Sequence, residues 1–112
     1  MGVYQAIIKL EGANNDSVLK NTALCAIGIM KQFEGFMDST EHKHFAKDYE
    51  QWREDKFEQH VYSVESFIEL ECIEFNASLE SIPYFLKDDV MVVGPFDEER
   101  MRYVCSGAKL IE

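Results

Sequence analysis

The sequence predicts an α+β fold: a two-layer domain in which an antiparallel or mixed sheet carries helices on one face. Two sequence patterns and the expected order of strands and helices support this fold class. Residues 3–11 alternate between apolar and mixed positions, as a strand does, and residues 18–33 repeat apolar side chains at helical spacing. The expected order is strand, long helix, polar helix, long strand, short helix and strand. A ferredoxin-like arrangement with the polar helix inserted is one instance of such a fold.

The first strand and the first helix have the clearest patterns. One face of the strand is expected to be fully buried, and it consists of Tyr4, Ala6, Ile8 and Leu10. Turn-forming residues follow at positions 12–16, where Asp16 or Ser17 can cap the next helix. That helix has apolar residues around much of its circumference, so we expect it to be the main core helix. Gly35 is expected to end it.

The stretch from residue 38 to about residue 60 is expected to form a second, polar helix. Asp38-Ser39-Thr40-Glu41 has the arrangement of a capping box at its start. Within it, an aromatic stripe has roughly helical spacing and consists of Phe45, Tyr49, Trp52 and Phe57. A long excursion between two strands is the alternative interpretation of this stretch.

The second half of the chain is harder to assign. Residues 61–75 fit either period, but their β-branched and aromatic residues favour a long strand, bulged near Ile73. We expect a short helix to follow, with Ser78 as its cap and with Ile82, Phe85 and Leu86 on its inner side. A strand over residues 89–93 then ends at Gly94-Pro95. The tail predicts either one helical turn through Arg102 or a last strand over residues 103–105.

Length and composition indicate a single domain spanning residues 1–112. Apolar residues make up 46% of the chain and charged residues 29%, which excludes intrinsic disorder. No apolar run reaches the ~18 residues of a membrane span, and no signal-peptide pattern is present. Three widely separated cysteines, Cys25, Cys72 and Cys105, favour a reducing cytoplasmic location and three buried thiols.

The charge is strongly acidic and unevenly distributed. Acidic residues outnumber basic ones by 21 to 11, a formal net charge of −10, which disfavours direct binding to nucleic acid or to an anionic membrane. Residues 61–80 hold five acidic residues and no basic one. On a strand, Glu65, Phe67, Glu69 and Glu71 would share one face. Such a row of carboxylates suits a basic surface on another protein.

Residues with the spacing that catalysis or metal binding needs are scarce. The chain has no glycine-rich phosphate loop, no dinucleotide fingerprint and no nucleophile elbow. His42 and His44 do not face each other on a helix, and too few further ligands accompany them for a zinc site. We therefore expect neither catalytic residues nor a metal or cofactor.

The leading hypothesis is a small cytoplasmic protein that binds another protein. We expect an inhibitor or antidote that occupies the basic site of a nucleic-acid-handling protein, of the phage anti-defence or toxin-immunity type, with a homodimer left open. The partner-binding residues are expected to be Glu65, Phe67, Glu69, Glu71, Glu74, Tyr49 and Trp52.

Two alternatives belong to other classes. One is a ligand-binding or enzymatic α+β domain, expected to be dimeric, with a pocket between helices and sheet. Its lining would come from Tyr4, His60, Tyr62, Cys72 and Tyr84. The other is a structural subunit of a larger assembly.

Overall fold

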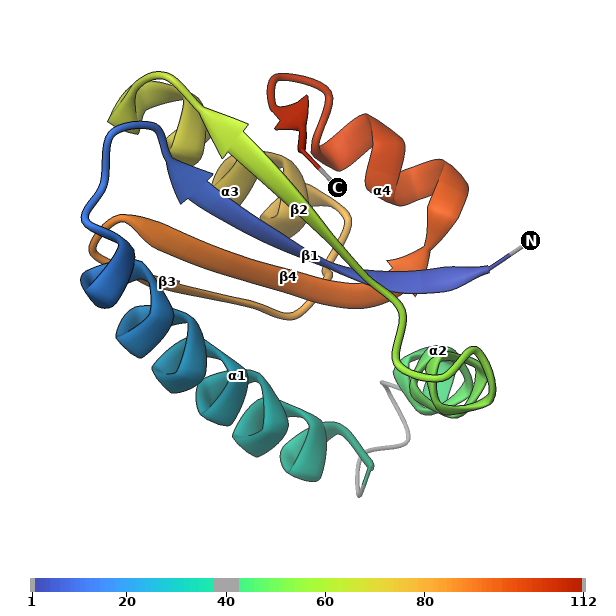
Figure 1. The fold of residues 1–112 in the computed structure, drawn as a ribbon. Helices are drawn as coiled ribbons and strands as arrows, with labels where there is room; N and C mark the ends of the chain where they lie inside the picture. The colour runs from blue at the N-terminus through green and yellow to red at the C-terminus, as the bar shows by residue number, and fades with distance from the viewer. Residues whose placement is uncertain (1, 38–42, 112) are drawn as a thin grey trace.

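The computed structural model describes residues 2–37 and 43–111, which form a five-stranded mixed sheet and four helices (Figure 1). The predicted α+β class and mixed sheet are confirmed. In chain order the elements are β1 (Val3–Leu10), α1 (Asn15–Met37), α2 (Lys43–Glu54), β2 (Gln59–Val64), α3 (Phe67–Leu79), β3 (Tyr84–Lys87), β4 (Val90–Asp97), α4 (Glu98–Val104) and β5 (Lys109–Leu110).

The sheet has the strand order β3-β4-β1-β2-β5, with β1 at its centre. β1 pairs in parallel with β2 and antiparallel with β4, and Ile7 lies opposite both Val61 and Val92. The pairs β3–β4 and β2–β5 are antiparallel. The parallel pair joins two segments separated by α1 and α2, and it brings the N-terminal strand beside residues 59–64.

Helices cover both faces of the sheet, whereas the sequence predicts them on one. Tyr4, Ala6 and Ile8 of β1 pack in the larger core cluster, which includes buried residues of α3 and α4. Ile7, from the opposite side of β1, packs with Cys25 of α1. The physical reason lies in the central strands: the whole of β4 from Val90 to Phe96 is buried, and a continuous apolar strand needs cover on both sides.

The predicted strand over residues 61–75 is wrong beyond Val64. The Ser66 hydroxyl accepts a hydrogen bond from the Glu69 backbone N–H (3.4 Å), and the Glu69 carboxylate accepts one from the Glu65 N–H (2.7 Å). The first contact satisfies a backbone donor that the first turn of a helix leaves unpaired, and the second holds the residue before the cap against the Glu69 side chain. The buried residues of α3 then recur at helical spacing, at Leu70, Ile73 and Ala77.

Further boundaries also differ from the predicted ones. Asn14, not Asp16 or Ser17, caps α1: its side-chain oxygen accepts from the backbone N–H of both residues. Gly35 lies inside α1, not at its end. The predicted capping box at 38–41 lies outside the described residues, but α2 confirms a helix within the polar stretch.

The predicted short helix with Ser78 as its cap does not form. Ser78 lies in the last turn of α3, and residues 84–87 pair with β4 as the hairpin strand β3. β4 continues through Gly94-Pro95, where the β1–β4 register shifts between Tyr4 and Ala6, and the irregularity accommodates a proline that has no N–H to donate. The predicted helical turn in the tail is confirmed as α4, capped by Asp97.

The three cysteines have different environments. Cys25 and Cys105 are buried, as predicted, but Cys72 is exposed. The correction follows from the change of secondary structure, because a helix over residues 67–79 turns Leu70 and Ile73 inward and leaves Cys72 on the outer side.

Candidate functional site

The outer side of α3 carries a run of apolar residues, which we call the α3 face and define as Phe67, Ile68, Glu71, Cys72, Phe75 and Leu79. Four large apolar side chains on this face are substantially exposed, at 45% for Phe67, 72% for Ile68, 63% for Phe75 and 64% for Leu79. Positions 68, 72, 75 and 79 follow helical spacing and form one stripe along the helix. Exposed apolar stripes of this kind mark interaction surfaces in proteins.

Acidic residues lie on and beside the α3 face, but not as the predicted row. Glu65 lies before the helix, Glu69 forms part of its cap, and Glu71 is exposed. A helix turns about 100° per residue, so Glu69 and Glu71 cannot share a face as they would on a strand. Glu74 is half-buried. Among the described residues no ion pair joins any of these carboxylates to a basic side chain, and residues 61–80 themselves hold no lysine or arginine. Lys109 of β5 lines a shallow hollow together with Glu65 and Glu69.

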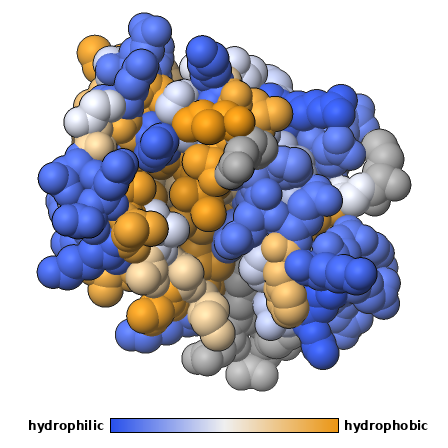
Figure 2. Space-filling view, in the orientation of Figure 1, coloured by the Kyte–Doolittle hydropathy of each residue, from blue (hydrophilic) through white to orange (hydrophobic). Residues whose placement is uncertain are grey.

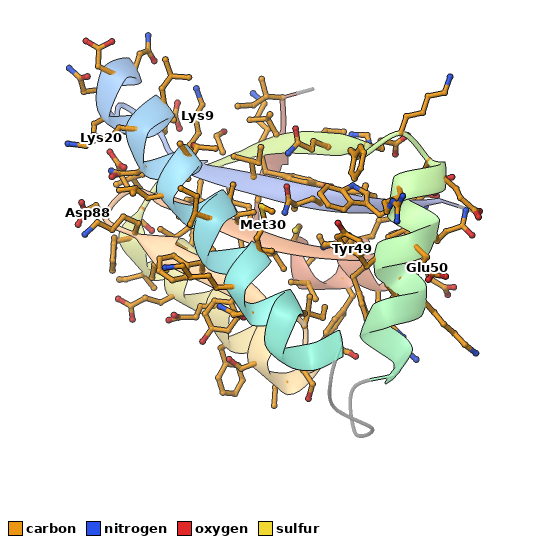
Figure 3. All side chains as sticks on the ribbon, turned by 90° about the horizontal axis from the view of Figure 1, so that it is seen from below. Lys9, Lys20, Met30, Tyr49, Glu50 and Asp88 are labelled. Carbon is orange, nitrogen blue, oxygen red and sulfur yellow. The ribbon has the colours of Figure 1, made fainter. Side chains whose placement is uncertain are left out.

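Tyr49 and Trp52, also predicted as partner-binding residues, lie on the other side of the sheet. They line a cleft of about 370 Å³ between α1 and α2, together with Met30 and Gln5. Met30 and Tyr49 lie on the facing sides of the two helices (Figure 3). In the orientation of Figure 1, apolar residues gather along the middle of the molecular surface, with hydrophilic residues on either side (Figure 2). The predicted partner-binding residues are therefore divided between two surfaces.

A second cavity, which we call the tyrosine pocket, has a volume of about 330 Å³. The Tyr4 and Tyr62 hydroxyl oxygens are 2.8 Å apart, and the His60 ring meets the Tyr4 ring edge-on with centroids 4.4 Å apart. The structure thus brings together three of the five predicted pocket residues, and leaves Cys72 and Tyr84 elsewhere. The full lining is Tyr4, His60, Tyr62, Glu98, Arg102, Cys105, Ser106, Ala108 and Leu110.

Sequence reasoning missed the contribution of α4 and the following turn to this pocket. Glu98 and Arg102 form an ion pair of 2.7 Å, one helical turn apart. Their i,i+4 spacing was a signal for a helix in the tail, but nothing local in the sequence indicates which tyrosines that helix covers. The pairing of β1 with β2, more than fifty residues later, makes that connection.

The deep wall of the tyrosine pocket is uncharged at neutral pH. Burial raises the pKa of the Cys105 thiol to about 12. Burial also raises the pKa of Tyr4 and Tyr62, and the hydrogen bond that Tyr4 shares with Tyr62 raises the pKa of Tyr4 further. Cys105 is therefore a protonated thiol, unsuited to nucleophilic attack, and the two phenols are hydrogen-bond donors.

The described residues contain no group of three or more histidine, cysteine, aspartate or glutamate side chains that could hold a metal ion. The sequence-based expectation that His42 and His44 form no zinc site concerns side chains outside the described part of the chain. Of the described helices, none is long and apolar enough to cross a membrane.

Comparison with known proteins gives no family for this chain. No protein-family model matches it, and no curated protein does. The α3 face and the tyrosine pocket are accordingly interpreted from their own chemistry.

Proposed function

We propose that this protein binds another protein through the α3 face, and that the partner presents an apolar groove bordered by lysine or arginine side chains. The observation that carries the proposal is the exposed apolar stripe beside carboxylates that no basic residue of the same segment neutralises. The contact would be of the helix-in-groove type, with anchors spaced along one helix.

The apolar side chains supply the affinity in this proposal. Burial of apolar surface contributes about 25 cal/mol per Å², and aromatic anchors at the centre of an interface contribute most. Phe75 lies in the middle of the stripe and is the best anchor by this criterion. Ile68 and Leu79 extend the contact by about two turns toward the N-terminal and one toward the C-terminal end of the helix.

The carboxylates supply the selectivity. Glu65 and Glu71 are exposed, and at a net charge of −10 the whole chain attracts a basic partner and repels an acidic one. A basic site on a nucleic-acid-handling protein has the required charge, so an inhibitor or antidote of such a protein is the class that we propose. The carboxylates act here beside an apolar contact, since the predicted row on one strand face is not formed.

The test compares the partner affinity of two variants, each of which carries a matched pair of surface substitutions. Ile68→Ala with Phe75→Ala truncates the α3 face, and Leu19→Ala with Ile27→Ala truncates two other exposed apolar side chains, on α1. Partners captured from the native host by the unmodified protein are purified, and their dissociation constants are measured for both variants. We expect a loss of about tenfold or more for the α3 variant only.

Salt dependence separates the apolar and acidic parts of the proposal. Glu71→Gln should slow association at low salt and have little effect at high salt. A partner that binds both alanine variants equally would overturn the proposal, and so would an affinity that does not change with ionic strength. A partner that turned out to be a second copy of the chain would also overturn it, because two acidic α3 faces repel each other.

A further inference from the structure

We propose that the tyrosine pocket binds a small uncharged carbonyl compound, such as an aromatic amide, whose oxygen accepts a hydrogen bond from the Tyr4–Tyr62 pair. This site is separate from the α3 face and does not depend on the function proposed above. Three properties of the pocket lead to this ligand class: an available hydroxyl proton, apolar walls, and charges that are already compensated.

One of the two tyrosine hydroxyl protons is available to a ligand, as a count of donors and acceptors shows. Tyr4 and Tyr62 each carry one hydroxyl proton, and only one of the two can lie between oxygens that are 2.8 Å apart. Both side chains are more than nine-tenths buried. Among the described residues neither hydroxyl has a further acceptor, so the second proton is left for a molecule in the pocket that both residues line. Such a molecule must offer an acceptor atom.

The walls determine the body of the ligand. Ala108 and Leu110 of the C-terminal segment and the Cys105 side chain provide apolar surface beside the two phenol rings. A volume of about 330 Å³ is at the lower end of ordinary ligand pockets, so the ligand is small. An aromatic ring fits this combination because it can pack against the tyrosine rings.

The charges around the pocket disfavour an anionic ligand. At the rim, Arg102 is paired with Glu98 at 2.7 Å, and His60 contacts the Glu58 carboxylate at 3.0 Å. The buried tyrosine and cysteine groups stay neutral, and the Arg102 charge that reaches the Tyr62 hydroxyl is opposed there by that of Glu98. A carboxylate in the pocket would lose its hydration without gaining a free cation, whereas a neutral amide loses far less.

The experiment uses benzamide and benzoate, which share a shape and differ in charge. Each is titrated into the full chain, and backbone amide shifts are followed by NMR. We expect saturable shifts at residues of β2 and of segment 98–110 with benzamide, and at least about tenfold weaker binding of benzoate. Saturable shifts elsewhere, no saturable shift, or tighter binding of benzoate would overturn the proposal.

Phenylalanine substitutions test the role of the hydroxyl pair. Tyr4→Phe or Tyr62→Phe alone leaves one donor, so each should retain binding, whereas the double variant should weaken benzamide binding about tenfold. Tyr103→Phe is the matched control, because Tyr103 is an exposed tyrosine of α4 outside the pocket. If the double variant does not fold, Ala108→Leu fills the pocket and should abolish binding. Unchanged binding in the folded double variant, or in Ala108→Leu, would overturn the proposal.

Discussion

Helices α1 and α3 pack on opposite faces of the sheet, and both expose apolar side chains on their outer sides. On α1 these are Leu19, Leu24, Ile27 and Met30, and on α3 they are Phe67, Ile68, Phe75 and Leu79. The helices differ in charge. The segment of α1 balances two acidic residues with two basic ones, whereas that of α3 has three acidic residues and no basic one. Exposed apolar area is thus common to both helices, but only α3 combines it with negative charge that its own segment does not balance, and the proposed contact depends on this combination.

The inner sides of the two helices differ as well. α3 buries Leu70 and Ile73 in the larger core cluster. α1 approaches β3 closely at Gly28, where a Cβ atom would overlap the ring of Phe85. The glycine lets α1 approach the sheet closely, whereas the large buried side chains of α3 fill a wider space between that helix and the sheet. The α3 face therefore stands on a well-filled core, and changes on its outer side can be separated from changes in folding.

The largest expected effect is the loss of stability when a buried side chain of α3 is truncated. Leu70→Ala should lower the free energy of unfolding by about 2–5 kcal/mol, because it removes fully buried methyl groups and leaves a cavity. Ile68→Ala, two residues earlier on the exposed side, should change it by about 0.5 kcal/mol or less. Urea denaturation followed by circular dichroism measures both. Equal losses would show that Ile68 is buried in the protein in solution.

A smaller effect is the pH dependence of the free energy of unfolding, for which Cys25 of α1 is compared with Cys72 of α3. Burial raises the pKa of the Cys25 thiol from 9.0 to about 11. Between pH 9 and 11 the unfolded chain loses this proton and the folded chain keeps it. The free energy of unfolding should therefore fall as pH rises, by at most about 1.4 kcal/mol per pH unit for this thiol.

The two alanine variants isolate that contribution. Cys25→Ala should reduce the loss of stability between pH 9 and 11, measured by urea denaturation at each pH. Cys72→Ala is the matched control, because it also removes one thiol but at an exposed position. An identical slope in the unmodified protein and in Cys25→Ala would contradict the assignment of a buried, protonated thiol.

The difference between the helices also explains which elements could be predicted. α1 begins after a clear turn, and β1 alternates cleanly, so both were predicted from their period. On α3 the buried positions 70, 73 and 77 and the exposed positions 68, 75 and 79 are all apolar, which removes the contrast that reveals a helix. The remaining signal was local: Ser66, followed three residues later by Glu69, is a capping-box pattern.

The tyrosine pocket could be predicted only in part. Tyr4 and Tyr62 were recognisable as strand residues on buried faces, and both were expected as pocket residues. Their contact depends on the parallel pairing of β1 with β2, in which Ala6 lies opposite His60. That register is fixed by packing over the whole sheet and leaves no local pattern in the sequence. The α4 residues that complete the pocket are placed by the same tertiary packing.

The smallest effect concerns the first turns of the two helices. Asn14 accepts backbone hydrogen bonds from Asp16 at 2.9 Å and from Ser17 at 3.2 Å, whereas Ser66 accepts one, from Glu69 at 3.4 Å. Loss of a cap residue costs about 0.5–2 kcal/mol, and the cost depends on the hydrogen bonds that are lost. Asn14→Ala should therefore lower the free energy of unfolding by about 1–2 kcal/mol, and Ser66→Ala by about 0.5–1 kcal/mol.

The Ser66 variant has a further use, because Glu69 still accepts from the Glu65 N–H (2.7 Å) when the hydroxyl is removed. The start of α3 should then remain helical, and hydrogen exchange of the Glu69 amide should accelerate more than that of the Glu65 amide. Glu69→Ala should accelerate exchange at Glu65 instead. Equal acceleration of both amides in both variants would mean that the turn unfolds as a unit, and that Glu69 and Ser66 have no separable roles in beginning the helix that presents the α3 face.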